Sequence, residues 1–122
     1  MNLETFRDYC LQKDHVDESF PFDENTLVFK FNNKIFASVS LKDERNNSCN
    51  LKCDPERALL LREQFGGIVP GYHSNKKHWN TLSFNEDVSD QLIFELVDHS
   101  YQLLFQSFSK KVQKELNECT NR

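Results

Sequence analysis

The chain has 122 residues, of which 38% are hydrophobic and 28% charged, and its formal net charge is -4. This length suits one domain spanning residues 1–122, and a composition with eleven phenylalanines predicts a packed core rather than a disordered chain. No apolar run approaches the ~20 residues of a membrane span, and the N-terminus lacks the pattern of a signal peptide. We therefore expect a cytoplasmic protein, and its acidic balance argues against polyanion binding over the whole surface.

Four helices are predicted from capping residues and apolar spacing. They cover residues 3–13, 55–64, 90–107 and 109–117, with Asn2, Asp54 and Ser89 as N-caps of the first three. Gly66 is predicted to end the second helix. Residues 14–25 read as an acidic connector that tucks Phe20 and Phe22 under the fold.

Strands are predicted from residue 27 to residue 41, at 48–53 and at 79–84, where apolar and polar residues alternate. The first of these stretches must contain a turn at Asn32-Asn33. A two-residue loop would pair Phe31 with Lys34, so we expect a three-residue loop that keeps all odd-numbered residues on the core face. Val28 and Phe36 would then form an apolar spot on the outer face.

The order of these elements predicts an α+β fold, a two-layer domain in which helices cover one face of an antiparallel sheet. The other face would be partly open. By the alternation of the strands it would carry Lys30, Lys34, Phe36, Lys52 and Trp79.

The segment that stands out chemically lies between Glu63 and Glu86, where no acidic residue occurs. It begins with all three glycines of the chain and continues with two histidines, a Lys-Lys pair and the only tryptophan. Lysines can contact phosphates, histidine and asparagine can donate hydrogen bonds, and Tyr72 or Trp79 can stack on a base. The plain structural alternative is a solvated turn whose tryptophan anchors a strand.

Other chemistry is less well supported. A thiol nucleophile would need Cys49 or Cys53 beside His73 or His78, but the alternation turns both cysteines inward, away from solvent. The cysteine and histidine spacings do not match a zinc site. We expect neither a metal nor a cofactor, and no catalytic signature is present.

Several motifs resemble those of the MmcQ/YjbR family of small bacterial proteins. The most specific is residues 69–81 (VPGYHSNKKHWNT), and shorter matches lie at residues 20–22 (FPF), 27–30 (LVFK), 52–55 (KCDP) and 98–101 (DHSY). The resemblance covers about residues 2–117. It implies a CyaY-like (frataxin-like) α+β fold and DNA binding through a "double wing" motif, without established catalytic residues.

The resulting expectation is a DNA-binding protein without enzymatic activity, monomeric and not attached to a membrane. The candidate DNA-binding residues lie on the loop and on the open sheet face: Tyr72, His73, Asn75, Lys76, Lys77, His78, Trp79, Lys30, Lys34 and Lys52. Two alternatives remain open. One is a protein- or small-ligand-binding module that uses the same loop with Val28, Phe36 and Trp79. The other is an enzyme with His73 and His78 converging on a pocket.

Overall fold

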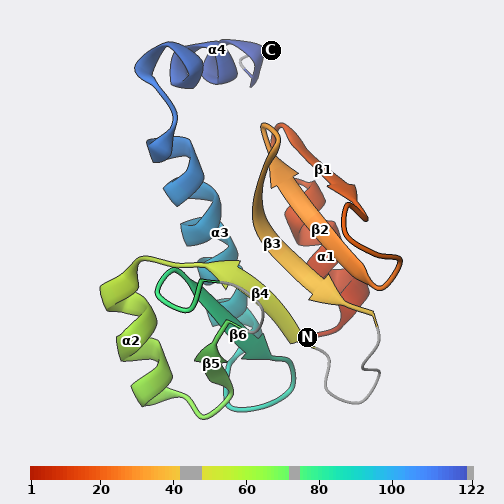
Figure 1. The fold of residues 1–122 in the computed structure, drawn as a ribbon, viewed down its shortest axis with the longest axis vertical. Coiled ribbons are helices and arrows are strands. Elements are labelled where there is room, and N and C mark those ends of the chain that lie inside the picture. Colours follow the sequence, from red (N-terminus) through yellow and green to blue (C-terminus); the bar gives the residue numbers. More distant parts are fainter. Residues whose placement is uncertain (42–47, 72–74, 121–122) are drawn as a thin grey trace.

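The computed structural model describes residues 1–41, 48–71 and 75–120, and Figure 1 shows their arrangement. In chain order the elements are α1 (Leu3–Leu11), β1 (Val16–Ser19), β2 (Thr26–Phe31), β3 (Lys34–Ser40), β4 (Ser48–Lys52), α2 (Pro55–Gln64), β5 (Ile68–Pro70), β6 (Trp79–Ser83), α3 (Asp90–Ser107) and α4 (Lys110–Thr120).

All six strands join one antiparallel sheet in the order β1-β2-β3-β4-β6-β5. Helices α1 and α3 lie behind this sheet in Figure 1, while α4 lies beyond the end that carries the β2–β3 turn. The core forms between the sheet and the helices. Phe6 of α1 packs on Phe29 of β2, and the buried Ser100 hydroxyl of α3 donates to the carbonyl oxygen of Phe36. The predicted α+β class, with helices on one face of an antiparallel sheet, is confirmed.

Helix starts follow the capping residues. Asn2, Asp54 and Ser89 each accept a hydrogen bond from a backbone N–H in the first turn of α1, α2 and α3, and Pro55 opens α2. These side chains satisfy amides that otherwise lack a partner at a helix N-terminus. α2 ends where it was predicted to end. The helix stops at Gln64 with Phe65 in an extended conformation, and the described glycines all have negative φ, so Gly66 is no left-handed cap.

The glycines after α2 instead bind an acidic side chain. The amides of Gly66 and Gly67 donate to the two carboxylate oxygens of Asp87, at 2.7 and 2.8 Å. A Cβ on Gly67 would lie 2.7 Å from the nearer oxygen, whereas one on Gly66 would lie 3.7 Å from the other. Only Gly67 is therefore required by the close approach of Asp87.

The β2–β3 hairpin corrects the predicted loop. Phe31 pairs with Lys34, so the turn has two residues, and Asn32 and Asn33 both have positive φ, as the common two-residue hairpin turns of type I′ require. Pairing then changes from Lys30 with Ile35 to Phe29 with Ala37. Phe36 is the extra residue of a β-bulge, which restores the alternation that a two-residue turn would otherwise invert.

The bulge changes which side chains face solvent. Phe36 turns to the helix face, where its buried ring meets the ring of Tyr101 edge-on at 5.9 Å. Val28 is also buried. The predicted apolar spot formed by Val28 and Phe36 is therefore wrong. In the connector between β1 and β2 the prediction is also wrong, but here two side chains predicted to be buried are exposed. Phe20 is 49% exposed and Phe22 is 71% exposed.

Two strands were not predicted. β1 has a single apolar residue, and it is held at the sheet edge by pairing with β2 and by Glu18, which forms a two-point ion pair with Arg7 of α1. β5 has three residues inside the glycine-rich segment and pairs with β6. Both form through long-range contacts that a local alternation pattern cannot show.

His99 of α3 joins that helix to the start of α2. Its Nε2 accepts a hydrogen bond from the amide of Asp54 at 3.1 Å, which fixes the neutral ring as the form that fits. Burial, with a contribution from Arg57, lowers the pKa of His99 below its usual value. The unfolded chain therefore takes up a proton at this residue more readily than the folded chain does.

It follows that the stabilisation from neutral His99 is present above about pH 6.5 and is lost as pH falls through the lower folded-state pKa. We expect His99→Gln, which keeps an acceptor oxygen but cannot titrate, to flatten the fall in unfolding free energy between about pH 7 and pH 5. Urea unfolding at several pH values measures this. Parallel curves for the two proteins would show that His99 does not contribute.

Candidate nucleic-acid interface

The loop between β5 and β6 is closed at its base by Gly71 and Trp79. The Gly71 amide donates to the carbonyl oxygen of Trp79 at 2.8 Å. A Cβ on Gly71 would lie 2.7 Å from the Trp79 Cβ and 2.9 Å from the Trp79 carbonyl oxygen. The two chain segments can therefore approach this closely only because residue 71 has no side chain.

The far part of the loop is a turn built on Asn75. Its side-chain oxygen accepts from the Lys77 amide at 3.0 Å, and its carbonyl oxygen accepts from the His78 amide at 3.1 Å. This turn leaves Asn75, Lys76 and Lys77 exposed and His78 and Trp79 half-buried. Tyr72 and His73, which were also predicted as site residues, lie outside the described residues.

Arg62, near the end of α2, braces the loop from the helix side. Its Nε donates to Oδ1 of the buried Asn80 at 2.6 Å. Its Nη2 donates to the carbonyl oxygens of Trp79, at 3.2 Å, and of Lys76. The amide group of Asn80 in turn donates to the carbonyl oxygen of Ala58 in α2. Sequence reasoning missed Arg62, because an arginine in the last turn of a helix is ordinarily explained by the helix dipole.

The sheet face opposite the helices carries a row of polar side chains. Strand pairing aligns Ser38 of β3 with Asn50 of β4, and Asn50 with Thr81 of β6. The Thr81 hydroxyl donates to Asn50 Oδ1 at 2.5 Å, and Asn50 Nδ2 donates to the Ser38 hydroxyl at 3.2 Å. The row continues to Val69 of β5, which is 47% exposed. Ser38, Asn50 and Thr81 are half-buried and hydrogen-bonded across three strands. On its other side the row meets Val28 of β2, which pairs with Ser38 and is buried, so the accessible part of this face lies over β4, β6 and β5.

The lysines predicted for the open face divide into two groups. Lys52 pairs with Trp79 across β4 and β6, and Lys30 pairs with Asp17 of β1, so these residues share the open face. Lys34 does not. It pairs with Phe31 of the core, and its Nζ lies 5.8 Å from the ring centroid of Phe108, on the helix side. The bulge at Phe36 is the physical reason, because it lets Lys34 and Ser38 point to opposite faces.

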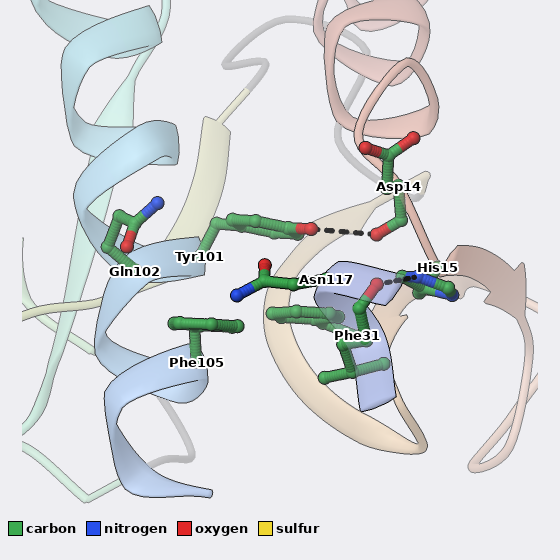
Figure 2. A pocket seen from close by; sticks show the side chains of 8 residues that line it. Asp14, His15, Phe31, Tyr101, Gln102, Phe105 and Asn117 are labelled. Atoms are coloured by element: carbon green, nitrogen blue, oxygen red, sulfur yellow. Dashed lines mark hydrogen bonds between the residues drawn. The ribbon is translucent and has the colours of Figure 1, made fainter. Parts of the chain in front are cut away.

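A pocket of about 220 Å³ lies elsewhere, between α3, α4 and the start of β1 (Figure 2). The ring of Phe31 stacks on Tyr101 at 4.0 Å, the Tyr101 hydroxyl donates to the carbonyl oxygen of Asp14, and Nε2 of His15 bonds to the carbonyl oxygen of Leu116. The His15 bond attaches α4 to the segment before β1, and the Tyr101 contacts attach α3 to β2 and to that same segment. The residues that line the pocket include no predicted site residue.

Cys49 and Cys53 are confirmed as buried, but only Cys49 lies in a strand, because β4 ends at Lys52. Cys49 and Cys53 lie in the core, and burial raises the pKa of the Cys53 thiol to about 11 and that of Cys49 well above its ordinary value. Thiols held in this protonated form are poor nucleophiles.

Within the described ranges, no three histidine, cysteine or acidic side chains gather closely enough to hold a metal ion. Nor does any helix described combine the length and apolar character needed to cross a membrane.

The fold and the loop define a class of small α+β domain with one face of its antiparallel sheet open. Comparison with known proteins names this class, since the YjbR family model matches residues 11–103. The chain belongs to the YjbR family. It is 35% identical to the uncharacterised protein YbdF of Escherichia coli O157:H7, over 91% of this chain and 90% of that one. It is 34% identical to the uncharacterised protein YjbR of Escherichia coli K12, over 84% and 86% of the two chains.

Solved structures give the same result. The crystal structure of protein DR2400 of Deinococcus radiodurans is similar to this chain with a TM-score of 0.86 and 37% identity, covering 93% of this chain and 86% of that one. A crystal structure of a Pseudomonas syringae protein has a TM-score of 0.73 and 31% identity, covering 84% of this chain and 98% of the other.

Proposed function

We propose that this chain is a DNA-binding protein without catalytic activity, and that DNA lies on the open sheet face and the loop 75–79. The observation that carries the proposal is the pairing of Lys52 with Trp79 on that face, directly beside the exposed Lys76 and Lys77. Cationic side chains beside a partly exposed aromatic ring can contact phosphates and a base together. The "double wing" comparison implied by the family resemblance is part of this proposal.

The braced geometry of the loop favours a binding role. Its backbone is held by hydrogen bonds that involve Gly71, Asn75 and Arg62, so a ligand would not have to order the described part of the loop. Preorganised groups bind with a smaller entropic cost. The alternative of an apolar protein-binding surface loses support, because Val28 and Phe36, two of its three residues, are buried.

A salt titration of DNA binding tests the proposal. Three to four lysines on phosphates predict that the logarithm of the binding constant falls with the logarithm of salt concentration with a slope of about -2 to -4. Fluorescence anisotropy of labelled duplex and single-stranded oligonucleotides, from about 25 to about 200 mM salt, gives this slope. Absence of binding to either DNA form at the lowest salt concentration would refute the proposed function.

A further inference from the structure

The cations of the open face are few for a duplex-binding surface. Lys34 lies on the helix side, and Lys30 faces the carboxylate-bearing Asp17 across the strand pair. This leaves Lys52, Lys76 and Lys77 without an acidic residue directly opposite in the sheet or adjacent in the described loop. Proteins that depend on contacts with duplex phosphates commonly make about six to ten of them.

The width of the open face is a second argument. Strands β3, β4, β6 and β5 lie side by side, and neighbouring strands are about 4.8 Å apart, so this part of the face is about 14 Å wide. The major groove of B-DNA is about 12 Å wide and admits a helix or a two-stranded ribbon. Asn50 lies on β4, an inner strand of this face, so a base edge reaches it most readily when the base is unpaired and free to lie on the sheet.

The same residues suit an unpaired base. The amide of Asn50 uses one N–H and one oxygen lone pair in its bonds to Ser38 and Thr81, which leaves a second donor and a second acceptor site by valence. Trp79 lies on the same face, two residues before Thr81 along β6 and therefore about 7 Å away. An aromatic side chain that stacks on one base beside polar groups that read a base edge is how sheet surfaces recognise single strands.

We infer that the nucleic acid bound at this face is single-stranded DNA, with one base stacked on Trp79, a base edge on the Ser38–Asn50–Thr81 row, and phosphates at Lys52, Lys76 and Lys77. This inference rests on the proposed function, and it specifies which form of DNA the site accepts. Duplex DNA is the competing ligand.

The single tryptophan of the chain provides the measurement. Titration with an oligothymidylate of about ten nucleotides is expected to quench Trp79 fluorescence, because stacked bases quench tryptophan, and a duplex of equal length is expected to bind about tenfold more weakly. Trp79→Ala is expected to weaken single-strand binding about tenfold by anisotropy, while Trp79→Phe, which keeps a stacking ring and packs similarly, retains most of it. Asn50→Asp is expected to weaken single-strand binding by placing a negative charge in the row.

The outcomes separate the inference from the proposed function. Duplex binding as tight as single-strand binding, or single-strand binding with Trp79 emission unchanged, overturns the inference while DNA binding itself stands. Equal binding by Trp79→Ala and Trp79→Phe overturns the stacking role. Absence of binding to both DNA forms overturns the inference and the proposed function together.

Discussion

Replacement of Gly71 with alanine is expected to destabilise the protein by about 2 to 3 kcal/mol, as overpacking of a closely packed position does. The new Cβ would lie 2.7 Å from the Trp79 Cβ and 2.9 Å from its carbonyl oxygen. These atoms belong to a strand that is paired on both sides, so neither can move without disturbing β4 or β5. The hydrogen bond from the Gly71 amide to Trp79 would lengthen, and the base of the loop would open.

Gly66→Ala is the matched control, since its Cβ would meet only the Asp87 carboxylate at an ordinary 3.7 Å. Urea unfolding followed by Trp79 fluorescence compares the two variants with the wild-type chain. We expect Gly66→Ala to remain within about 0.5 kcal/mol of the wild-type free energy of unfolding, as most surface substitutions do. Equal losses in both variants would show that the close contact at Gly71 is not responsible.

Replacement of Arg62 with alanine is expected to cost about 1 to 3 kcal/mol of stability, because it leaves the side-chain oxygen of Asn80 buried without its donor. The same change removes the donor to the carbonyl oxygens of Trp79 and Lys76. DNA binding is therefore expected to weaken as well, although Arg62 is not placed among the residues that contact DNA.

Arg62→Lys keeps the positive charge but not the planar fork that reaches several oxygens at once. We expect it to recover only part of the stability and part of the binding. Differential scanning calorimetry with DNA-binding anisotropy on the same samples measures both. Full recovery in Arg62→Lys would show that charge alone, rather than the geometry of the brace, holds the loop.

The correction at the β2–β3 hairpin shows where a sequence pattern fails. The alternation of apolar residues predicts both strands, and the residue pair Asn32-Asn33 predicts the turn. The same pattern predicted the wrong loop length because it assumed an unbroken ladder. A bulge at Phe36 reconciles a two-residue turn with burial of Phe31 and Ala37, and it moves Lys34 off the open face.

The loop shows the complementary case. Its position, its lysines and the start of β6 at Trp79 follow from local sequence, since glycine, proline and the absence of acids all lie within one segment. The hydrogen bonds of Arg62 to the loop and of Asp87 to the glycine amides cannot be predicted from local sequence. Each of them joins residues that lie about 15 to 20 positions apart through tertiary structure. Such contacts become visible only when the helix and strands are placed together.

We propose the loop and the adjoining sheet face as the DNA-binding site. The most direct test compares Lys76→Ala/Lys77→Ala with Lys110→Ala/Lys111→Ala, since each removes two exposed charges and the second pair lies on α4. In a salt titration of DNA binding, the loop variant is predicted to reduce the steepness of the log–log slope by about 1.4 to 1.8, and the α4 variant is predicted to leave it unchanged. Equal effects of the two variants, or no effect of the loop variant, would contradict this account.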